Sequence, residues 1–353
     1  MPRNTTEVAV LAGDGIGPEV MQVTLEVLRR LDRRHALGLH FVPHEAGAMA
    51  YRQSGTELSD EVFAACEKAD AILLGAMGWP GIAHEDGTEI TPQITLRQRL
   101  DLYAGLRPSR AIPGVPPPLS HPDASGIDLV IVRESTEGLF YSKDRGTVTP
   151  DWAEETLRIT RDTTTRLAQR SFELAAKRRG KVTLVDKANV FRAFAWMRGI
   201  FAEVAATRPG VEFEAMYVDA VALDFIRRPW EFDVVPTENM FGDILSDLAA
   251  GLIGGMGFAP SADVGDRHAV FQPSHGTAPT IAGKGIANPT AMLLSAAMML
   301  DWLGEPHMAD AAAELRAAVD AAFLAGLRTP DIGGSHGTVE VGRRVMDELP
   351  SGS

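Results

Sequence analysis

Short apolar runs alternate with amphipathic segments along most of the chain. The runs typical of buried strands are residues 8–11, 71–74, 129–132, 182–185, 213–218 and 232–235. Apolar side chains at helical spacing predict helices over residues 18–34, 59–68, 151–179, 241–253, 289–302, 310–327 and 337–349. Stretches with glycine, proline and polar residues predict loops over residues 79–93, 251–257, 259–262 and 271–288. Strands that alternate with helices predict an α/β protein with a parallel sheet covered by helices, and ligands of such sheets bind at the carboxyl ends of the strands.

The turn at residues 12–19 carries three glycines, Gly13, Gly15 and Gly17. Their spacing is G-x-G-x-G, whereas the dinucleotide fingerprint of Rossmann folds is G-x-G-x-x-G. An acidic residue at the end of a second strand is missing as well. We therefore predict a tight turn from strand to helix, near a ligand, and not a Rossmann site.

Length and charge narrow the class of protein. A chain of 353 residues exceeds one ordinary core and favours two domains. A net charge of −13 disfavours nucleic acid and anionic membranes as partners. The chain has no apolar run of about 18 residues that would span a membrane and no apolar signal segment at its start. The single cysteine, Cys66, excludes an internal disulfide framework, so we expect a cytoplasmic protein. The negative net charge leaves a small molecule as the expected partner.

Two aspartates, Asp243 and Asp247, stand one turn apart in the predicted helix 241–253. Their Cβ atoms are expected about 5–6 Å apart, where like charges weaken an isolated helix. A divalent cation between them would remove that penalty. Carboxylates without cysteine or histidine favour magnesium or manganese over zinc. The alternative is a solvated acidic face.

Three arginines are candidates for binding an acidic substrate. Arg97 and Arg107 flank apolar positions that should fix their segment to the core, and Arg133 ends the strand 129–132. A guanidinium group presents a planar fork that matches a carboxylate. Each arginine alone would more ordinarily form a surface ion pair. Converging beside a metal site, the three would indicate a di- or tricarboxylate substrate.

Other polar residues follow predicted strands or lie in the long loop. Lys187 follows the strand 182–185, where burial and a nearby cation would make it a usable base, although a salt bridge is the ordinary role. Asp219 follows the strand 213–218 in the same way. His275 stands in a loop whose small residues let the backbone lie close to a ligand, so it is a candidate for contact with adenine or nicotinamide.

Together these segments resemble the β-decarboxylating hydroxyacid dehydrogenases, the family of isopropylmalate, isocitrate, homoisocitrate and tartrate/D-malate dehydrogenases. The motifs that carry the resemblance are T-E-N-M-F-G-D-I-L-S-D at 237–247, H-G-T-A-P at 275–279 and I-A-G-K-G-I-A-N-P-T-A at 281–291. The spacing from Asp219 to Asp243 also fits, and the resemblance runs from Gly13 to Gly334.

The resemblance implies an isopropylmalate-dehydrogenase-like two-domain α/β fold, unrelated to the Rossmann type, with a parallel or mixed central sheet flanked by helices. Residues 1–103 and 255–353 would form a large nucleotide-binding domain. Residues 104–254 would form a small domain for dimerisation and for metal and substrate binding. The protein is then expected to be a homodimer with shared active sites.

The resemblance also implies a role for each site residue. Asp243 and Asp247, with Asp219 of the partner subunit, would hold magnesium or manganese, and Arg97, Arg107 and Arg133 would bind the malate carboxylates. Lys187 of the partner subunit, helped by Asp219, would remove the hydroxyl proton as hydride leaves C2 for NAD, and the β-keto acid would then lose carbon dioxide. The residues expected to contact the cofactor are His275, Gly276, Thr277, Ala278, Pro279, Thr280, Asn288 and Asn189.

Two departures from the family concern the proton donor and the nucleotide. The family places a tyrosine seven residues after the arginine that matches Arg133, as the final acid; here that position is Phe140, followed by Tyr141. Tyr141 is the acid if the loop shifts by one residue; otherwise another acid serves, or decarboxylation is impaired. NAD-dependent members carry an aspartate where this chain has Thr280, and the Lys-Tyr pair of bacterial NADP enzymes is absent too. A 2′-phosphate would meet no obvious cation there, so NAD is expected.

A third departure concerns the substrate. Thr91 and Gln93 precede Arg97, where isopropylmalate enzymes have leucine-type residues that bury the isopropyl group. Polar side chains would line such a pocket poorly. Our single prediction is 3-isopropylmalate, and tartrate/D-malate, isocitrate and homoisocitrate remain alternatives. A catalytically silent regulatory subunit, or a dehydrogenase that does not decarboxylate, are further alternatives.

Overall fold

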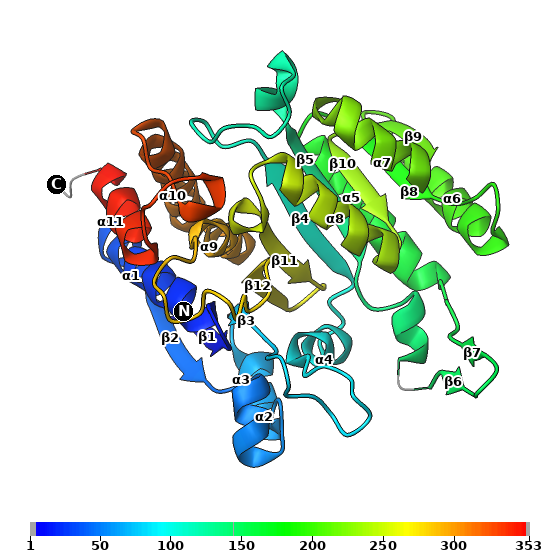
Figure 1. Cartoon of the computed structure of the whole chain (residues 1–353). Coiled ribbons are helices and arrows are strands. Elements are labelled where there is room, and N and C mark those ends of the chain that lie inside the picture. Colours follow the sequence, from blue (N-terminus) through cyan, green and yellow to red (C-terminus); the bar gives the residue numbers. More distant parts are fainter. Residues whose placement is uncertain (1–4, 144, 351–353) are drawn as a thin grey trace.

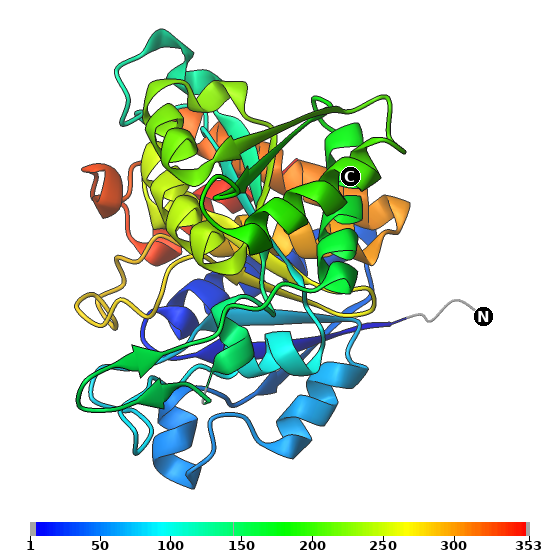
Figure 2. The same cartoon turned by 90° about the vertical axis from the view of Figure 1, so that its right-hand side faces the viewer.

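A ten-stranded mixed sheet forms the centre of the protein (Figure 1). The computed structural model describes residues 5–143 and 145–350. The strands of the large sheet are β1 Thr6–Gly13, β2 Leu39–His44, β3 Ala71–Ala76, β4 Ala104–Arg110, β5 Asp128–Glu134, β8 Lys181–Asp186, β9 Glu212–Tyr217, β10 Val234–Thr237, β11 Pro260–Val264 and β12 Ala269–Pro273. A separate hairpin consists of β6 Thr147–Val148 and β7 Ala153–Glu154, and it extends away from the large sheet (Figures 1 and 2).

The helices cover the sheet. They are α1 Gly17–His35, α2 Ala48–Ser54, α3 Asp60–Lys68, α4 Pro92–Arg99, α5 Arg161–Ala176, α6 Arg192–Ala205, α7 Val218–Arg227, α8 Asn239–Leu252, α9 Thr290–Leu303, α10 Pro306–Leu324 and α11 Thr338–Glu348. Among the helices in the described ranges, none is both long and apolar enough to cross a lipid bilayer.

The order of the strands separates the chain into two groups. The order is β2-β1-β3-β12-β11-β4-β5-β10-β8-β9. The strands from β2 to β11 come from residues 6–76 and 260–273, and those from β4 to β9 come from residues 104–237. β4 is antiparallel to both β11 and β5, and β11 is antiparallel to β12, whereas the remaining pairs are parallel. The predicted α/β class with a parallel or mixed sheet flanked by helices is therefore confirmed.

Local sequence explains the central elements. Every residue of β3 is buried, as expected of a parallel strand covered on both faces. α1 buries Val20, Val27 and Leu31 along one stripe, and Pro18 stands in its first turn. α9 is apolar almost all round and lies in the core against β11, β12 and α10. The prediction of a packing helix there is confirmed.

Three predicted elements are wrong. The helix predicted over 151–179 begins only at Arg161, because Thr160 caps it by accepting the backbone N–H of Thr163, and the hairpin strand β7 lies upstream. The predicted loop 259–262 is mostly strand β11, and the first residues of the predicted loop 271–288 belong to β12. These short strands contain small residues and proline, and pairing with strands distant in the sequence stabilises them.

Candidate active site

A cleft of about 160 Å³ opens where β3 and β12 end, between α4 and the first half of α8. Its polar lining brings together residues from six separate stretches: Gln93, Arg97, Arg107, Arg133, Asp243, Ser246, Asp247, Ser261, Gln272, Ser274 and His275. The three candidate arginines and both candidate metal ligands of α8 thus line one cavity.

A buried carboxylate, Asp263 of β11, fixes two of the arginines. Its Oδ2 accepts the Nε–H of Arg97 at 2.9 Å, and its Oδ1 accepts Nη2 of Arg107 at 2.9 Å. Gln272 donates to Oδ2 at 2.9 Å. Burial by itself would raise the pKa of Asp263, but Arg107 and Arg97 hold that pKa well below its usual range. Asp263 is therefore ionised at neutral pH and orients the guanidinium groups.

The third arginine is held by α8. Nε and Nη2 of Arg133 donate to Oδ1 of Asn239 at 2.9 and 2.7 Å, and Nη1 donates to Asp243. Burial, and next the charge of Arg97, lower the pKa of Arg133 to about 10, so it stays charged at neutral pH. Asp263, Asp243 and Asp247 together balance the three arginines, so the cleft gains the excess positive charge that an acidic ligand needs when a divalent cation binds the two aspartates of α8.

The acidic pair of α8 fits a divalent cation. Asp243 and Asp247 both line the cleft, and burial followed by the charge of Asp243 raises the pKa of Asp247. Two carboxylates facing one space, one of them resisting ionisation, form a hard oxygen donor set whose repulsion a cation would relieve. Within residues 5–143 and 145–350, no three histidine, cysteine, aspartate or glutamate side chains gather as a metal site.

Lys187 and Asp219 pair with each other, outside this cleft. Nζ of Lys187 lies 2.6 Å from Oδ1 of Asp219, which is exposed in the first turn of α7, and the lysine lowers the pKa of Asp219. Asn189 is exposed two residues after Lys187. These three candidates share one surface, and within one chain none of them lines the arginine cleft.

The loop that carries His275 is held by the turn between β1 and α1. The backbone N–H of Ile16 donates to the carbonyl of Thr277 at 3.0 Å, and the carboxylate of Glu19 accepts the amides of Gly283 and Gly285. Gly15 has φ +59°, and a Cβ there would lie 2.2 Å from the carbonyl oxygen of Thr277, so only glycine permits this approach.

His275 itself faces the cleft. Its Nδ1 lies 2.9 Å from the carbonyl of Gly276, whereas its Nε2 is buried and has no hydrogen-bond partner within the described chain. Burial lowers the pKa of His275, so the ring is neutral at neutral pH. Of the other candidates in the loop, Pro279 and Thr280 are exposed, and Asn288 donates to Asp331 at 3.0 Å. A buried, unpaired ring nitrogen beside exposed loop residues fits a polar ligand such as a nucleotide.

Of the two candidates for substrate selection, Gln93 and Thr91, only one lines the cleft. Gln93 lines the cleft, and its Oε1 is buried without a hydrogen-bond partner within the described ranges. Thr91 precedes α4 and does not line the cleft; its backbone N–H donates to Glu57 at 3.0 Å. Gln93 is thus the one of the pair placed to contact a ligand.

Tyr141 lies outside the cleft. It belongs to a 3-10 helix, Leu139–Ser142, and the guanidinium carbon of Arg158 lies 3.7 Å from its ring centroid. The neighbouring Phe140 does not line the cleft either.

Sequence reasoning missed Asp263, Gln272 and Asn239. A signal existed for Asp263, because a lone charge within the apolar stretch 259–264 demands a buried partner. Asn239 lies inside the motif 237–247, and its position at the start of α8 was the available clue.

Comparisons with known proteins agree with this arrangement. The family model described as isocitrate/isopropylmalate dehydrogenase matches residues 7–345. The chain is 40% identical to a 3-isopropylmalate dehydrogenase of Aquifex aeolicus, covering 97% of this chain and 96% of that protein. It is 42% identical to a 3-isopropylmalate dehydrogenase of Methanothermobacter thermautotrophicus, with 97% and 98% covered.

Solved structures are similar over almost the full length. The crystal structure of isocitrate dehydrogenase from Methylococcus capsulatus matches with a TM-score of 0.87 at 34% identity, covering 98% of this chain and 99% of that one. A β-decarboxylating dehydrogenase from Thermococcus kodakarensis matches with a TM-score of 0.82 at 38% identity, with 98% and 96% covered.

Proposed function

Because the chain belongs to the isocitrate/isopropylmalate dehydrogenase family of β-decarboxylating oxidoreductases, we propose that it oxidises and decarboxylates a malate-type 2-hydroxy acid. The proposed cofactors are NAD and Mg²⁺ or Mn²⁺, and the proposed substrate is 3-isopropylmalate, which the names of its relatives suggest. The observation that carries the proposal is the cleft in which three arginines face Asp243 and Asp247.

Each group in the cleft has a task in this reaction. Arg97, Arg107 and Arg133 bind the carboxylates of the substrate, and Asp263 keeps the first two in position. Asp243 and Asp247 would hold the divalent cation. When bound, that cation acidifies the 2-hydroxyl and stabilises negative charge left by the departing carbon dioxide.

Proton transfer is assigned to the pair outside the cleft. Lys187 removes the hydroxyl proton, and Asp219 orients the ammonium group of Lys187 through their 2.6 Å contact. Tyr141 is the proposed final acid, although its ring packs on Arg158 within one chain. The proposal therefore needs Lys187 and Asp219 to reach the cleft of a second subunit, and it needs the loop of Tyr141 to shift by one residue.

NAD is the proposed nucleotide, bound along the loop 274–288. Nε2 of His275 is available to a polar ligand group, and Asn189 is the proposed contact from the partner subunit. Thr280 is exposed and uncharged, so no cation stands at that position for a 2′-phosphate. The single cysteine, Cys66, is buried and fits a cytoplasmic enzyme.

A homodimer with shared sites is supported by an exposed apolar surface beside Lys187 and Asp219. Its members lie on α7 and α8, which pack on each other: Leu223, Ile226, Met240 and Ile244. We call these four residues the α7–α8 face. Large apolar side chains exposed on neighbouring helices favour association with an identical face. In this proposal residues 104–254 form the small dimerisation domain, and residues 1–103 and 255–353 form the large domain.

Complementation between two inactive variants tests the shared site. Lys187→Met and Asp243→Asn are each expected to abolish NADH formation. Mixed and refolded together, they should recover about a quarter of wild-type activity, because half the dimers are hybrids and each hybrid has one intact site. Absence of recovery, with hybrids demonstrated by native mass spectrometry, would place each site within one chain.

A second candidate substrate is a malate with a polar substituent. The buried, unpartnered Oε1 of Gln93 favours it, because an isopropyl group would leave that oxygen unpaired. NADH and NADPH formation with manganese should be compared for 3-isopropylmalate, isocitrate, homoisocitrate, D-malate and tartrate. Gln93→Leu should improve turnover of 3-isopropylmalate and impair a polar substrate.

The same assay tests decarboxylation. One carbon dioxide per NADH is expected, and a ratio near zero would indicate a dehydrogenase that does not decarboxylate. Turnover of none of the five acids, despite measured Mn²⁺ binding, would contradict the proposed function and favour a silent regulatory subunit.

A further inference from the structure

A second hollow lies on the face of the sheet opposite the arginine cleft. On β4, Leu106 lines this hollow while Arg107 lines the cleft. On β11, Ala262 lines the hollow while Ser261 lines the cleft. Side chains alternate between the two faces of a strand, so one thickness of sheet separates the two cavities. We call this hollow, which β4, β5 and β11 floor between α5 and α9, the rear trough.

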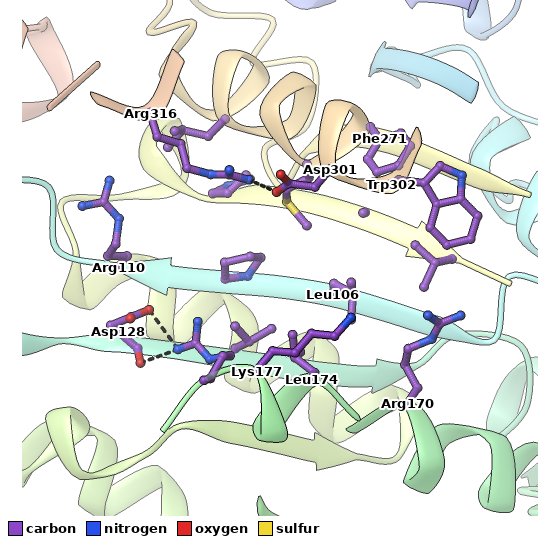
Figure 3. Close-up of a pocket in the computed structure, with 18 of the residues that line it drawn as sticks. Leu106, Arg110, Asp128, Arg170, Leu174, Lys177, Phe271, Asp301, Trp302 and Arg316 are labelled. Carbon is purple, nitrogen blue, oxygen red and sulfur yellow. Dashed lines mark hydrogen bonds and ion pairs between the residues drawn. The ribbon is translucent and has the colours of Figure 1, made fainter. Parts of the chain in front are cut away.

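The rear trough has an apolar floor and helical walls. Figure 3 shows β4 and β5 running between α9 on one side and α5 on the other. The cavity measures about 530 Å³, within the range of small-molecule sites. Its apolar lining includes Leu106, Pro108, Val130, Val264, Leu294 and Met298.

Most charged groups at the edge of the rear trough are already neutralised. Arg316 pairs with Asp301, as the dashed line in Figure 3 marks, and Arg110 pairs with Asp320 at 2.7 Å. Arg178 pairs with Asp128 at 3.0 Å, and Glu173 lies 3.5 Å from Arg208. These pairs leave no carboxylate free to compete for a further cation at this edge among the lining residues.

Two cations remain. The ammonium group of Lys177 has no ion-pair or hydrogen-bond partner among the described residues, and its side chain reaches over the strand floor in Figure 3. The guanidinium group of Arg170 donates to the carbonyl of Gly265 at 3.3 Å and has no carboxylate partner in the described chain. An unpaired positive end on an apolar trough is complementary to a molecule with one negative head and an apolar body.

We propose that the rear trough binds an amphipathic monoanion, a carboxylate with a medium-length apolar body. The carboxylate contacts Lys177 and Arg170, and the body covers the floor formed by Leu106 and Val264. Burial of the body supplies most of the affinity, and the cations determine the charge of the head group.

Calorimetric titration of the full chain with octanoate tests this site. Lys177→Glu is expected to weaken octanoate binding about tenfold or more, because it replaces attraction by repulsion at the head group. Lys68→Glu is the matched control: both lysines are exposed at the carboxyl end of a helix, and Lys68 lies outside the trough. Octylamine, which has the same body and the opposite charge, should not bind, and butyrate should bind more weakly than octanoate.

Two results would overturn the proposal. One is equal affinity of Lys177→Glu and Lys68→Glu for octanoate when both variants melt at the wild-type temperature. The other is displacement of octanoate by malate, which would place the anion in the arginine cleft. Neither measurement depends on catalytic turnover, so the result is independent of the proposed function.

Discussion

At the scale of single residues, the arrangement of the cleft depends on buried charges that the arginines neutralise. Asp263 is fully buried, yet it stays ionised because Arg97 and Arg107 donate to it. Buried charge pairs add little net stability when intact, but breaking one leaves an unpaired charge in the interior. The contacts of Asp263 that position Arg97 and Arg107 therefore also contribute to the free energy of unfolding.

Asp263→Asn is expected to lower the free energy of unfolding by about 3 kcal/mol at neutral pH, since two arginines lose their buried anion. The KM for the acid substrate should rise about tenfold or more as the guanidinium groups move. Chemical denaturation and initial rates measure the two effects. Asp60→Asn, which breaks an exposed contact with Arg99 and removes one acidic group from the first turn of α3, should cost less than about 1 kcal/mol.

The same variant has a pH signature. The folded-state pKa of Asp263 lies below the unfolded value of about 3.9, so its contribution to stability is present above about pH 4 and is lost as pH falls through the folded pKa. The difference in stability between wild type and Asp263→Asn should therefore shrink on acidification below about pH 4. A difference independent of pH down to the acid transition would contradict this role.

At the scale of elements, glycines set the distances between segments that form the site. Gly242 lets α8 approach β5, because a Cβ there would lie 2.7 Å from Cβ and from Cγ of Arg133. Gly15 performs the same task for the β1–α1 turn and the loop at Thr277. Both contacts join segments far apart in the sequence.

Gly242→Ala is expected to destabilise the protein by about 1–3 kcal/mol through overpacking, and to weaken Mn²⁺ binding by displacing Asp243. Gly251→Ala is a control on the same helix, because a Cβ there meets no atom within 4 Å. The control should be neutral or stabilise by up to about 1 kcal/mol. Thermal unfolding and Mn²⁺ titration of both variants measure these effects. Equal melting temperatures and equal Mn²⁺ affinities of the two variants would contradict the packing role of Gly242.

Gly15→Ala should raise the KM for NAD, since its methyl group would push the Thr277 backbone away from the turn. Gly55→Ala is the control: Gly55 also has a positive φ, +77°, but its added Cβ meets nothing within 4 Å. Both variants suffer the strain of a left-handed backbone, about 1–2 kcal/mol, and only Gly15→Ala should affect the nucleotide. An unchanged KM for NAD in Gly15→Ala would show that the turn between β1 and α1 does not affect nucleotide binding.

At the scale of the whole molecule, one continuous sheet joins the two groups of strands at the β11–β4 pair. The arginine cleft opens close to this junction, and the α7–α8 face lies among the helices of residues 104–254. Lys187 and Asp219 lie on the side of that face rather than in the cleft of their own chain. The distribution of reactive groups is thus the strongest reason to expect a dimer.

Ile244→Glu is expected to convert the dimer to monomers and abolish activity, because it buries a charge in the proposed interface. Leu223→Glu, on the neighbouring helix α7, should do the same and does not adjoin Asp243. Leu324→Glu is the control, since Leu324 is equally exposed on α10, away from this face. Light scattering gives the mass; dimers in both interface variants would refute the assignment of the face.

Periodicity and motifs determined the class of fold, the position of most helices and the candidates for chemistry. Local spacing was sufficient for these, because Asp243 and Asp247 share a helical turn whatever surrounds them. It was insufficient for β11, for the start of α5 at Arg161, and for the anion Asp263 between two arginines. β11 and Asp263 depend on contacts between segments more than a hundred residues apart, as in the pairing of Asp263 with Arg97. The start of α5 depends on the cap Thr160, which Glu137 holds in place. Only the tertiary structure decided that the arginines meet in one cleft and that Lys187 and Asp219 lie outside it.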